Sequence, residues 1–261
     1  MSTLLHFSRT SPQEKRPVVV LLHGLFGDLN NLATIRRHLE SEYDVLSVDL
    51  PDHGQSPHRD VFTLDGAVEC LKATLDHANV AEATLLGHSL GGKIAMRFAL
   101  NYPDMVNQLF VADIAPVPYS PRHQRVIAGL ENVSLSTLSS RKQADEQLSE
   151  HINEPGVRQF LLKSLYQTEE GNWAWRFNLT GLKKSYGQIS DWEDTDTTYN
   201  GKVLFIKGAN SDYLQSSHRE AISKYFPHAK AHIIDGAGHW LHAEKPQAFN
   251  AIVEKNLNKC N

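Results

Sequence analysis

Short runs of consecutive apolar residues alternate along this chain with longer segments in which apolar residues recur every three or four positions. Uninterrupted apolar runs are typical of strands buried on both faces, and the periodic segments are typical of amphipathic helices. This alternation predicts an α/β fold with a mostly parallel central sheet and helices on both faces. The predicted strands are 17–22, 45–48, a run that ends near Gly87, a run from Gln108 that stops at Asp113, 202–208 and 231–234.

The regular alternation breaks down between Tyr119 and about Asp196, where the chain is more polar and its pattern is helical. We therefore predict a core formed by residues 1–117 and 197–261, with a helical cap, or lid, inserted as residues 118–196. Trp173, Trp175 and Phe177 occupy alternate positions in this segment. They project into a pocket beneath the cap or pack the cap together, and we include Trp175 among the candidate pocket residues.

Composition and charge narrow the function classes. The chain has 261 residues, a formal net charge of −4 and no long basic run, so its charge favours neither nucleic acid nor an anionic membrane surface. No stretch approaches the ~20 apolar residues of a membrane span, and Met1–Phe7 is too poor in apolar residues for a signal peptide. We expect a cytoplasmic protein. Cys70 and Cys260 form neither a disulfide framework nor a metal-binding spacing.

The stretch Leu85–Gly92 contains the pattern G-x-S-x-G between a predicted strand and the predicted helix that follows. A sharp turn at Ser89 needs glycines two residues before and after it, because the backbone passes close to itself there. The serine hydroxyl would then be exposed at a helix N-terminus, whose amides favour developing negative charge. Ser89 is therefore the candidate nucleophile.

A serine hydroxyl needs a base within hydrogen-bond reach, and histidine has a suitable pKa. His239 follows Gly236-Ala237-Gly238 after a predicted strand and is the candidate base. We expect His23, at a strand end, to orient the following loop, and His88 to pack or bond within its own turn. His239-x-x-His242-x-Glu244 matches no familiar metal-site spacing, so we predict no metal site.

Four signatures occur in one order along the chain, and through them it resembles the α/β-hydrolase fold family. It is similar in closer detail to the small bacterial esterases of the YbfF type, through Ala112–Pro116 and Gly208–Ser211. The resemblance implies the chain order nucleophile, acid, histidine, and an oxyanion hole formed by the backbone amides of Leu25 and Leu90. The four signatures are His23-Gly24, Asp52–Ser56, Gly87–Gly91 and Gly236–His239.

Two aspartates are candidates for the acid. In most enzymes of this fold the acid follows the strand equivalent to 202–208 in a pattern Gly-x-x-Asp, but counting from Gly208 places Ser211 there and Asp212 one residue late. Asp113 follows the preceding predicted strand, and the YbfF-type resemblance places the acid at that position. We favour Asp113, with Asp212 as the alternative, and expect Ser211 to add a hydrogen bond to His239.

These residues predict a serine carboxylesterase that hydrolyses acyl esters, or acyl-CoA thioesters, through an acyl-enzyme with a Ser89–His239–Asp113 triad and no cofactor. The alternatives are a carbon–carbon bond hydrolase or lyase-type relative with the same triad, and a non-catalytic ligand-binding protein. The expected partner is a small-molecule ester. The candidate pocket residues are His23, Phe26, His88 and Trp175.

Two further groups of polar residues have open roles. Asp52 and His53 brace the loop near Ser89 or line the substrate entrance, and we favour bracing. Arg122, His123 and Arg125 form a solvated helix face or meet an anionic substrate, and we favour the solvated face.

Overall fold

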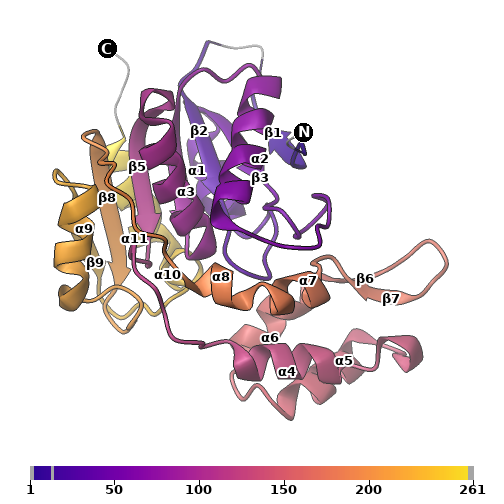
Figure 1. The fold of residues 1–261 in the computed structure, drawn as a ribbon. Coiled ribbons are helices and arrows are strands. Elements are labelled where there is room, and N and C mark those ends of the chain that lie inside the picture. The colour runs from indigo at the N-terminus through magenta and orange to yellow at the C-terminus, as the bar shows by residue number, and fades with distance from the viewer. Residues whose placement is uncertain (1–2, 13–14, 258–261) are drawn as a thin grey trace.

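The computed structural model describes residues 3–12 and 15–257, and a seven-stranded sheet runs through them (Figure 1). Its strand order is β1-β3-β2-β4-β5-β8-β9, and every pairing is parallel except that of β1 with β3. The predicted mostly parallel sheet is confirmed; β1 is too short to show a pattern and was not predicted. The strands are β1 (Phe7–Arg9), β2 (Val18–Leu22), β3 (Asp44–Val48), β4 (Ala83–His88), β5 (Val106–Ala112), β8 (Lys202–Gly208) and β9 (Lys230–Ile234).

Helices cover both faces of this sheet, because alternate side chains of each strand point to opposite sides. Against one face, α1 (Ala33–Leu39) and α11 (Pro246–Asn256) share an apolar cluster with Phe110 of β5. Against the other, α2 (Leu64–His77) and α3 (Leu90–Asn101) pack around Leu109, with α9 (Arg219–Tyr225) contributing Tyr225. Thr63 is the N-cap of α2, since its hydroxyl accepts from the amide of Gly66 at 3.0 Å. Shorter elements are η1 (Pro103–Met105), η3 (Ser216–His218) and α10 (Leu241–Glu244).

The segment between β5 and β8 forms a separate layer beyond one end of the sheet (Figure 1). It contains five helices among the described residues, but also an antiparallel hairpin of β6 and β7 that the helical pattern did not predict. Trp175, in that hairpin, stacks on Phe177 at 5.4 Å between ring centroids. The elements are α4 (Gln124–Asn132), η2 (Leu135–Thr137), α5 (Arg141–Ser149), α6 (Pro155–Leu162), β6 (Leu165–Gln167), β7 (Trp173–Trp175), α7 (Leu179–Lys184) and α8 (Tyr186–Ser190).

Lys93 connects this layer to the core of the molecule. It lies in α3, and its ammonium donates to the carbonyls of Ser190 at 2.7 Å and Asp191 at 2.8 Å, at the C-terminus of α8. Burial lowers the pKa of Lys93 to about 7, against the opposing effect of the nearby Asp191 carboxylate. A second fastening joins the hydroxyl of Ser164 to the carbonyl of Phe26 at 3.1 Å. Both contacts join this layer to the core close to the candidate site, because Lys93 lies in the helix that follows Ser89 and Phe26 is itself a candidate pocket residue.

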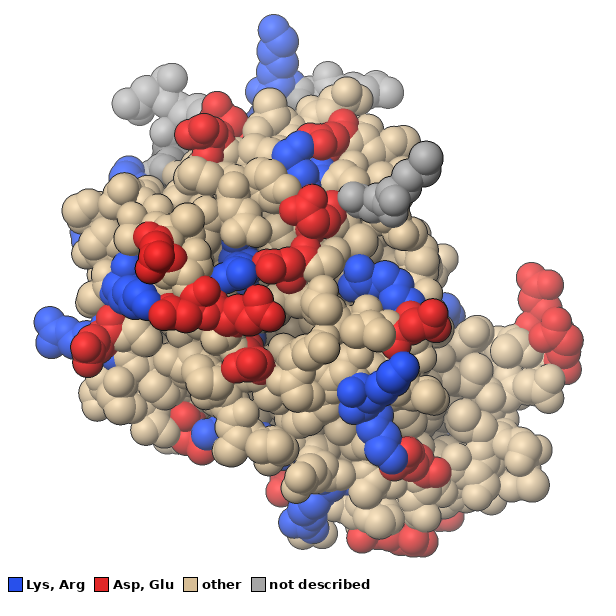
Figure 2. Space-filling view, in the orientation of Figure 1, with Lys and Arg blue, Asp and Glu red and all other residues tan. Residues whose placement is uncertain are grey.

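Acidic and basic side chains are interspersed on the face shown in Figure 2, without a large field of one sign. Arg97, for example, pairs with Asp65 at 2.7 Å. Within the described part of the chain, no helix combines the length and apolar character required to cross a bilayer. Cys70 is buried in α2, and Cys260 lies outside the described residues.

The turn between β4 and α3 allows no side chain at two of its glycines. A Cβ on Gly87 would lie less than 3.0 Å from the backbone of Gly91, and a Cβ on Gly91 would lie less than 3.0 Å from the carbonyl of Leu22 in β2. Since the obstacle in each case is backbone, it cannot be relieved by a rotamer change. The close approach of α3 to β2 therefore depends on these glycines.

We expect Gly91→Ala to lower the free energy of unfolding by about 3 kcal/mol, the upper range for forcing extra atoms into a packed core. Urea denaturation would measure it. Gly156→Ala is the matched control, because a Cβ there meets nothing within 4 Å and the residue lies in the first turn of α6. Equal stability of the two variants would contradict the inference that the close approach of α3 to β2 requires a glycine at position 91.

Candidate functional site

Ser89 stands between the end of β4 and the first residue of α3, with φ 53° and ψ −117°. A non-glycine residue with positive φ is strained and needs the surrounding structure to hold it. Here the strand ladder holds it, since the amide of Ser89 donates to the carbonyl of Ala112 at 3.0 Å. The side chain is thereby directed away from the sheet ladder towards the layer that contains α4.

The side chains of Ser89, His239 and Asp113 lie in a continuous hydrogen-bonded row. The hydroxyl of Ser89 donates to His239 Nε2 at 3.0 Å, and His239 Nδ1 donates to Asp113 Oδ2 at 2.8 Å. The three residues follow β4, β9 and β5, which end at the same edge of the parallel sheet. This edge is where open α/β sheets carry their sites.

Asp113 is fully buried and has a positive φ of 53°. Its Oδ1 accepts from the amide of Gly208 at 3.1 Å, and its Oδ2 accepts from the Ser211 hydroxyl as well as from His239. Its own amide donates to the carbonyl of Ile206 at 2.8 Å. A buried carboxylate is tolerated only when it is bonded in this way, so the three donors fix its position.

The alternative acid, Asp212, points elsewhere. Its side chain is 68% exposed and pairs with Arg122 at 2.7 Å. The hydrogen bond expected from Ser211 to His239 is made instead to Asp113, because the loop after β8 places the hydroxyl beside that carboxylate. Ser211 Oγ also accepts from the amide of Tyr213 at 3.2 Å. The loop after β8, where the acid usually lies in this fold, therefore supplies a hydrogen-bond donor to Asp113.

Two buried histidines join the loop after β2 to the loop after β3. His23 Nδ1 donates to the carbonyl of Gly24 at 2.8 Å, and its Nε2 accepts from the amide of Leu50 at 3.0 Å. His53 Nδ1 donates to the carbonyl of Pro51 at 2.8 Å, and its Nε2 accepts from the amide of Phe26 at 3.0 Å. One nitrogen of each ring accepts, so both rings are neutral.

Burial enforces the neutral state of these rings. It lowers the pKa of His23, and it is the largest cause that lowers the pKa of His53 to about 3. Asp52 adds to the bracing, since its Oδ1 accepts from the amide of Arg59 at 2.6 Å and from Asn178 at 3.0 Å. These contacts agree with the bracing role favoured for Asp52 and His53.

His88 holds the loop that carries His239. Its Nε2 donates to the carbonyl of His239 at 2.8 Å, so of the two roles expected for His88, packing or a local bond, the local bond is wrong: its partner lies across the sheet edge. Its ring also packs on His242 at 4.4 Å, and burial lowers the pKa of His88 well below its ordinary value. Glu244 fastens the same loop by accepting from the amides of Gly238 at 2.6 Å and Trp240 at 3.2 Å.

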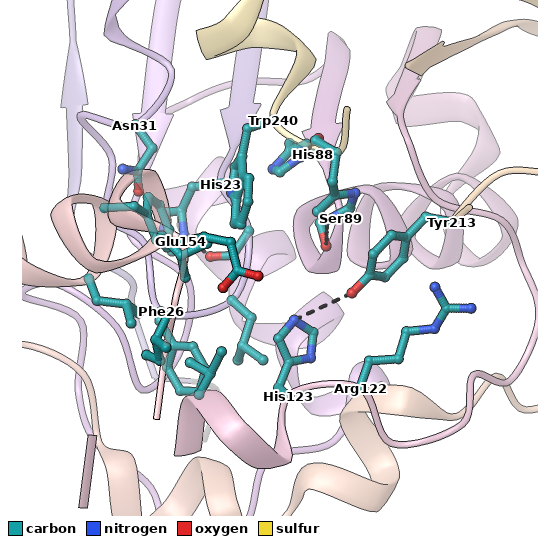
Figure 3. A pocket seen from close by; sticks show the side chains of 18 of the residues that line it. His23, Phe26, Asn31, His88, Ser89, Arg122, His123, Glu154, Tyr213 and Trp240 are labelled. Carbon is teal, nitrogen blue, oxygen red and sulfur yellow. Dashed lines mark hydrogen bonds between the residues drawn. The ribbon is translucent and has the colours of Figure 1, made fainter. Parts of the chain in front are cut away.

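A cavity of about 320 Å³ opens beside Ser89, between the sheet edge and the layer of α4 and α6 (Figure 3). The candidate residues His23, Phe26 and His88 line it, but Trp175 does not, because its ring is buried against Phe177. The indole Nε1 of Trp175 has no hydrogen-bond partner among the described residues. The apolar part of the lining is Leu25, Phe26, Leu32, Val126, Ile152, Val157, Phe160, Leu161 and Trp240.

Arg122, His123 and Arg125 also line this cavity; Arg122 and Arg125 are exposed, as the solvated face favoured for them requires, and His123 is half-buried. The guanidinium of Arg122 lies 4.7 Å from the ring centroid of Tyr213, and desolvation lowers the pKa of His123 to about 4. Sequence reasoning could not place these side chains, because the chain reaches α4 through an irregular segment whose path only packing defines.

A second, smaller cavity of about 40 Å³ also touches Ser89 and is lined by Leu25 and Leu90. Leu90 is the first residue of α3, so its amide has no acceptor within the helix. In the described part of the chain, neither the Leu25 amide nor the Leu90 amide donates to a protein acceptor. Two unused donors beside a serine hydroxyl can receive an anionic oxygen.

Sequence reasoning missed Tyr213, whose ring stacks on His239 with 3.9 Å between centroids and 20° between planes. Its backbone carbonyl accepts from the hydroxyl of Tyr119, which in turn accepts from the amide of Ala115 at 2.9 Å. Tyr213 therefore links the loop after β8 to the loop that carries Asp113. No local pattern marks it, although its position two residues after Ser211 could have suggested the neighbourhood.

Comparison with known proteins gives one consistent result. Residues 17–246 match the family described as alpha/beta hydrolase fold. The chain is 40% identical to esterase YbfF of Escherichia coli over 94% of this chain and 95% of the relative. It is also 40% identical to the sn-1-specific diacylglycerol lipase ABHD11 of Xenopus laevis, over 90% of this chain and 78% of that protein. A solved structure titled marine microorganism esterase superimposes with a TM-score of 0.94 at 34% identity, covering 98% and 100% of the two chains.

The buried neutral histidines predict a loss of stability in mild acid. His53 and His242 each have a pKa of about 3 in the folded protein, against about 6.5 in an unfolded chain. Below pH 6.5 the unfolded chain binds protons that the folded protein excludes, so the free energy of unfolding falls as pH drops. We expect a loss of about 2 kcal/mol per histidine at pH 5.

Urea denaturation at pH 7.5 and pH 5 would measure this loss. His53→Gln removes one of the titrating groups, so its stability should depend less on pH than that of the wild-type protein. A wild-type stability that is the same at both pH values would contradict the prediction.

Proposed function

This chain belongs to the α/β-hydrolase fold family, and we propose that it is a carboxylic ester hydrolase that uses Ser89 as its nucleophile. The observation that carries the proposal is the row from Ser89 through His239 to Asp113, with contacts of 3.0 and 2.8 Å. The esterase and lipase names of its relatives support the same reaction class. The cavity beside Ser89 provides room for an ester.

In the proposed reaction, Ser89 Oγ attacks the carbonyl carbon of the ester while His239 Nε2 takes the hydroxyl proton. Asp113 keeps the other proton on His239 Nδ1 and stabilises the imidazolium that forms. The carbonyl oxygen becomes an oxyanion that accepts from the amides of Leu25 and Leu90. Collapse of this intermediate breaks the ester C–O bond, and His239 returns its proton to the departing alcohol.

The acyl-enzyme on Ser89 is then hydrolysed. His239 takes a proton from a water molecule as the water oxygen attacks the acyl carbon, and a second tetrahedral intermediate forms at the same two amides. Its collapse breaks the bond to Ser89 Oγ, which recovers the proton from His239. The products are one carboxylic acid and one alcohol, and the enzyme is unchanged.

We also propose that residues 118–196 act as a cap over this site. The segment supplies Val126, Ile152 and Phe160 to the wall of the larger cavity, whereas the reacting side chains come from the rest of the chain. Apolar walls suit a hydrocarbon part of the substrate. Rates over a series of p-nitrophenyl acyl esters and matching acyl-CoA thioesters would define the acyl groups that fit.

Ser89→Ala should lower kcat for p-nitrophenyl butyrate by roughly 10⁴- to 10⁶-fold, because the nucleophile is removed. Initial rates of p-nitrophenol release would measure it, and a fluorophosphonate probe should label wild-type protein at Ser89 alone. Tight ester binding without turnover by the wild-type protein would favour a non-catalytic ligand-binding protein. A loss of less than tenfold would contradict the proposed nucleophile.

Asp113→Asn should lower kcat by about 10⁴-fold, because the amide no longer holds His239 in the required tautomer. Asp212→Asn is the matched control: its side chain is exposed, and we expect it to retain most of the activity. Both rates would be measured with the same ester, with circular dichroism to verify folding. A greater loss in the Asp212 variant would make the assignment of the acid wrong.

A further inference from the structure

His123 occupies the boundary between the two cavities beside Ser89. Together with Ser89 and Tyr213, it lines both the larger and the smaller cavity. In Figure 3 the His123 ring lies below Ser89 and faces the hydroxyl of Tyr213. The proposed mechanism uses neither His123 nor Tyr213 as an acid, base or nucleophile.

The hydroxyl of Tyr186 determines the tautomer of His123. It accepts from the amides of Arg122 at 3.2 Å and His123 at 3.1 Å, which uses both oxygen lone pairs. The same oxygen lies 2.6 Å from His123 Nδ1. Only the hydroxyl proton is left for this contact, so Tyr186 donates and Nδ1 accepts.

Because Nδ1 accepts, the ring proton of His123 is on Nε2 and the imidazole is neutral. Desolvation, with the positive potential of Arg122, lowers the pKa of His123 to about 4, in agreement with this state. His123 Nε2 lies 3.5 Å from the Tyr213 hydroxyl, a long contact at the limit of a hydrogen bond. Tyr213 accepts from Nε2 there and keeps its own proton, since burial raises its pKa to about 12.

On the basis of the proposed esterase function, we propose that His123 Nε2–H and the Tyr213 hydroxyl select esters carrying a second oxygen near the reacting carbonyl. Both donors are uncharged and face space next to Ser89, so they suit a neutral ether, hydroxyl or carbonyl oxygen. A purely hydrocarbon ester leaves them without a good acceptor, which is a cost in a buried site. Tyr186 is a positioning residue, acting only through His123.

The test compares esters that differ by one methylene replaced by oxygen. p-Nitrophenyl methoxyacetate and p-nitrophenyl butyrate probe the acyl side, and 2-methoxyethyl acetate and butyl acetate probe the alcohol side. The quantity is the ratio of kcat/KM for the oxygen ester to that for its hydrocarbon partner. Intrinsic reactivity cancels when this ratio is compared between the wild-type protein and a variant.

Tyr186→Phe, His123→Phe and Tyr213→Phe should each lower the ratio in at least one series by about two- to tenfold, the effect of losing one neutral hydrogen bond. His123→Gln keeps an N–H donor and should retain more of the ratio than His123→Phe. Tyr166→Phe is the matched control, because Tyr166 lies in the same segment and does not line either cavity. Its ratios should equal those of the wild-type protein.

Ratios that stay at the wild-type value in all of these variants, with active enzyme, would overturn this inference alone. Failure of the wild-type protein to turn over any of the four esters would overturn the proposed function, and the inference with it. Thermal melting of each variant distinguishes lost selectivity from lost folding, and the ratio itself is insensitive to the fraction of active protein.

Discussion

The site depends on one constraint, the burial of the Asp113 carboxylate. An ionised carboxylate away from water is stable only if its oxygens are bonded, and its partners here come from Gly208, Ser211 and His239. Gly208 is the last residue of β8, the neighbour of β5, and Ser211 lies in the loop that follows β8. His239 lies in the loop that follows β9. The strand order that makes β5, β8 and β9 adjacent is therefore also the order that makes a hydrogen-bonded acid possible at Asp113.

Neutral histidines connect the loops around this acid. His23, His53 and His88 each donate from one ring nitrogen to a backbone carbonyl, and the first two accept a backbone amide at the other. Burial keeps them uncharged, so they join loops without adding charge beside His239. His123 belongs to the same class, but its N–H lies at a cavity and makes only a long contact with the Tyr213 hydroxyl instead of bonding to a backbone carbonyl. In our proposal this ring acts in substrate selection, whereas the other three support loops.

Backbone strain is concentrated at the same edge of the sheet. Phe26, Asp52, Ser89 and Asp113 all have positive φ, and each follows a strand that ends beside the site. Such conformations persist where surrounding contacts fix them, here through the parallel ladder and the buried loops. The layer of α4 to α8 is fastened close by, through Lys93 in the helix that begins after Ser89. Ser89, Asp113 and the layer of α4 to α8 are thereby held in one frame.

The sequence by itself determined the central parallel strands of the sheet, because uninterrupted apolar runs record burial on both faces. The tight turn and the glycine-rich loop made Ser89 and His239 candidates for the site, and the resemblance to YbfF-type esterases favoured Asp113 at a strand end. Only the tertiary structure decided what these residues contact: Ser211 bonds to Asp113, His88 bonds to the carbonyl of His239, and Trp175 packs away from the cavity. The β6–β7 hairpin and the positions of Arg122 and His123 were equally hidden. Such contacts join residues far apart in the chain, and side-chain packing rather than local pattern sets them.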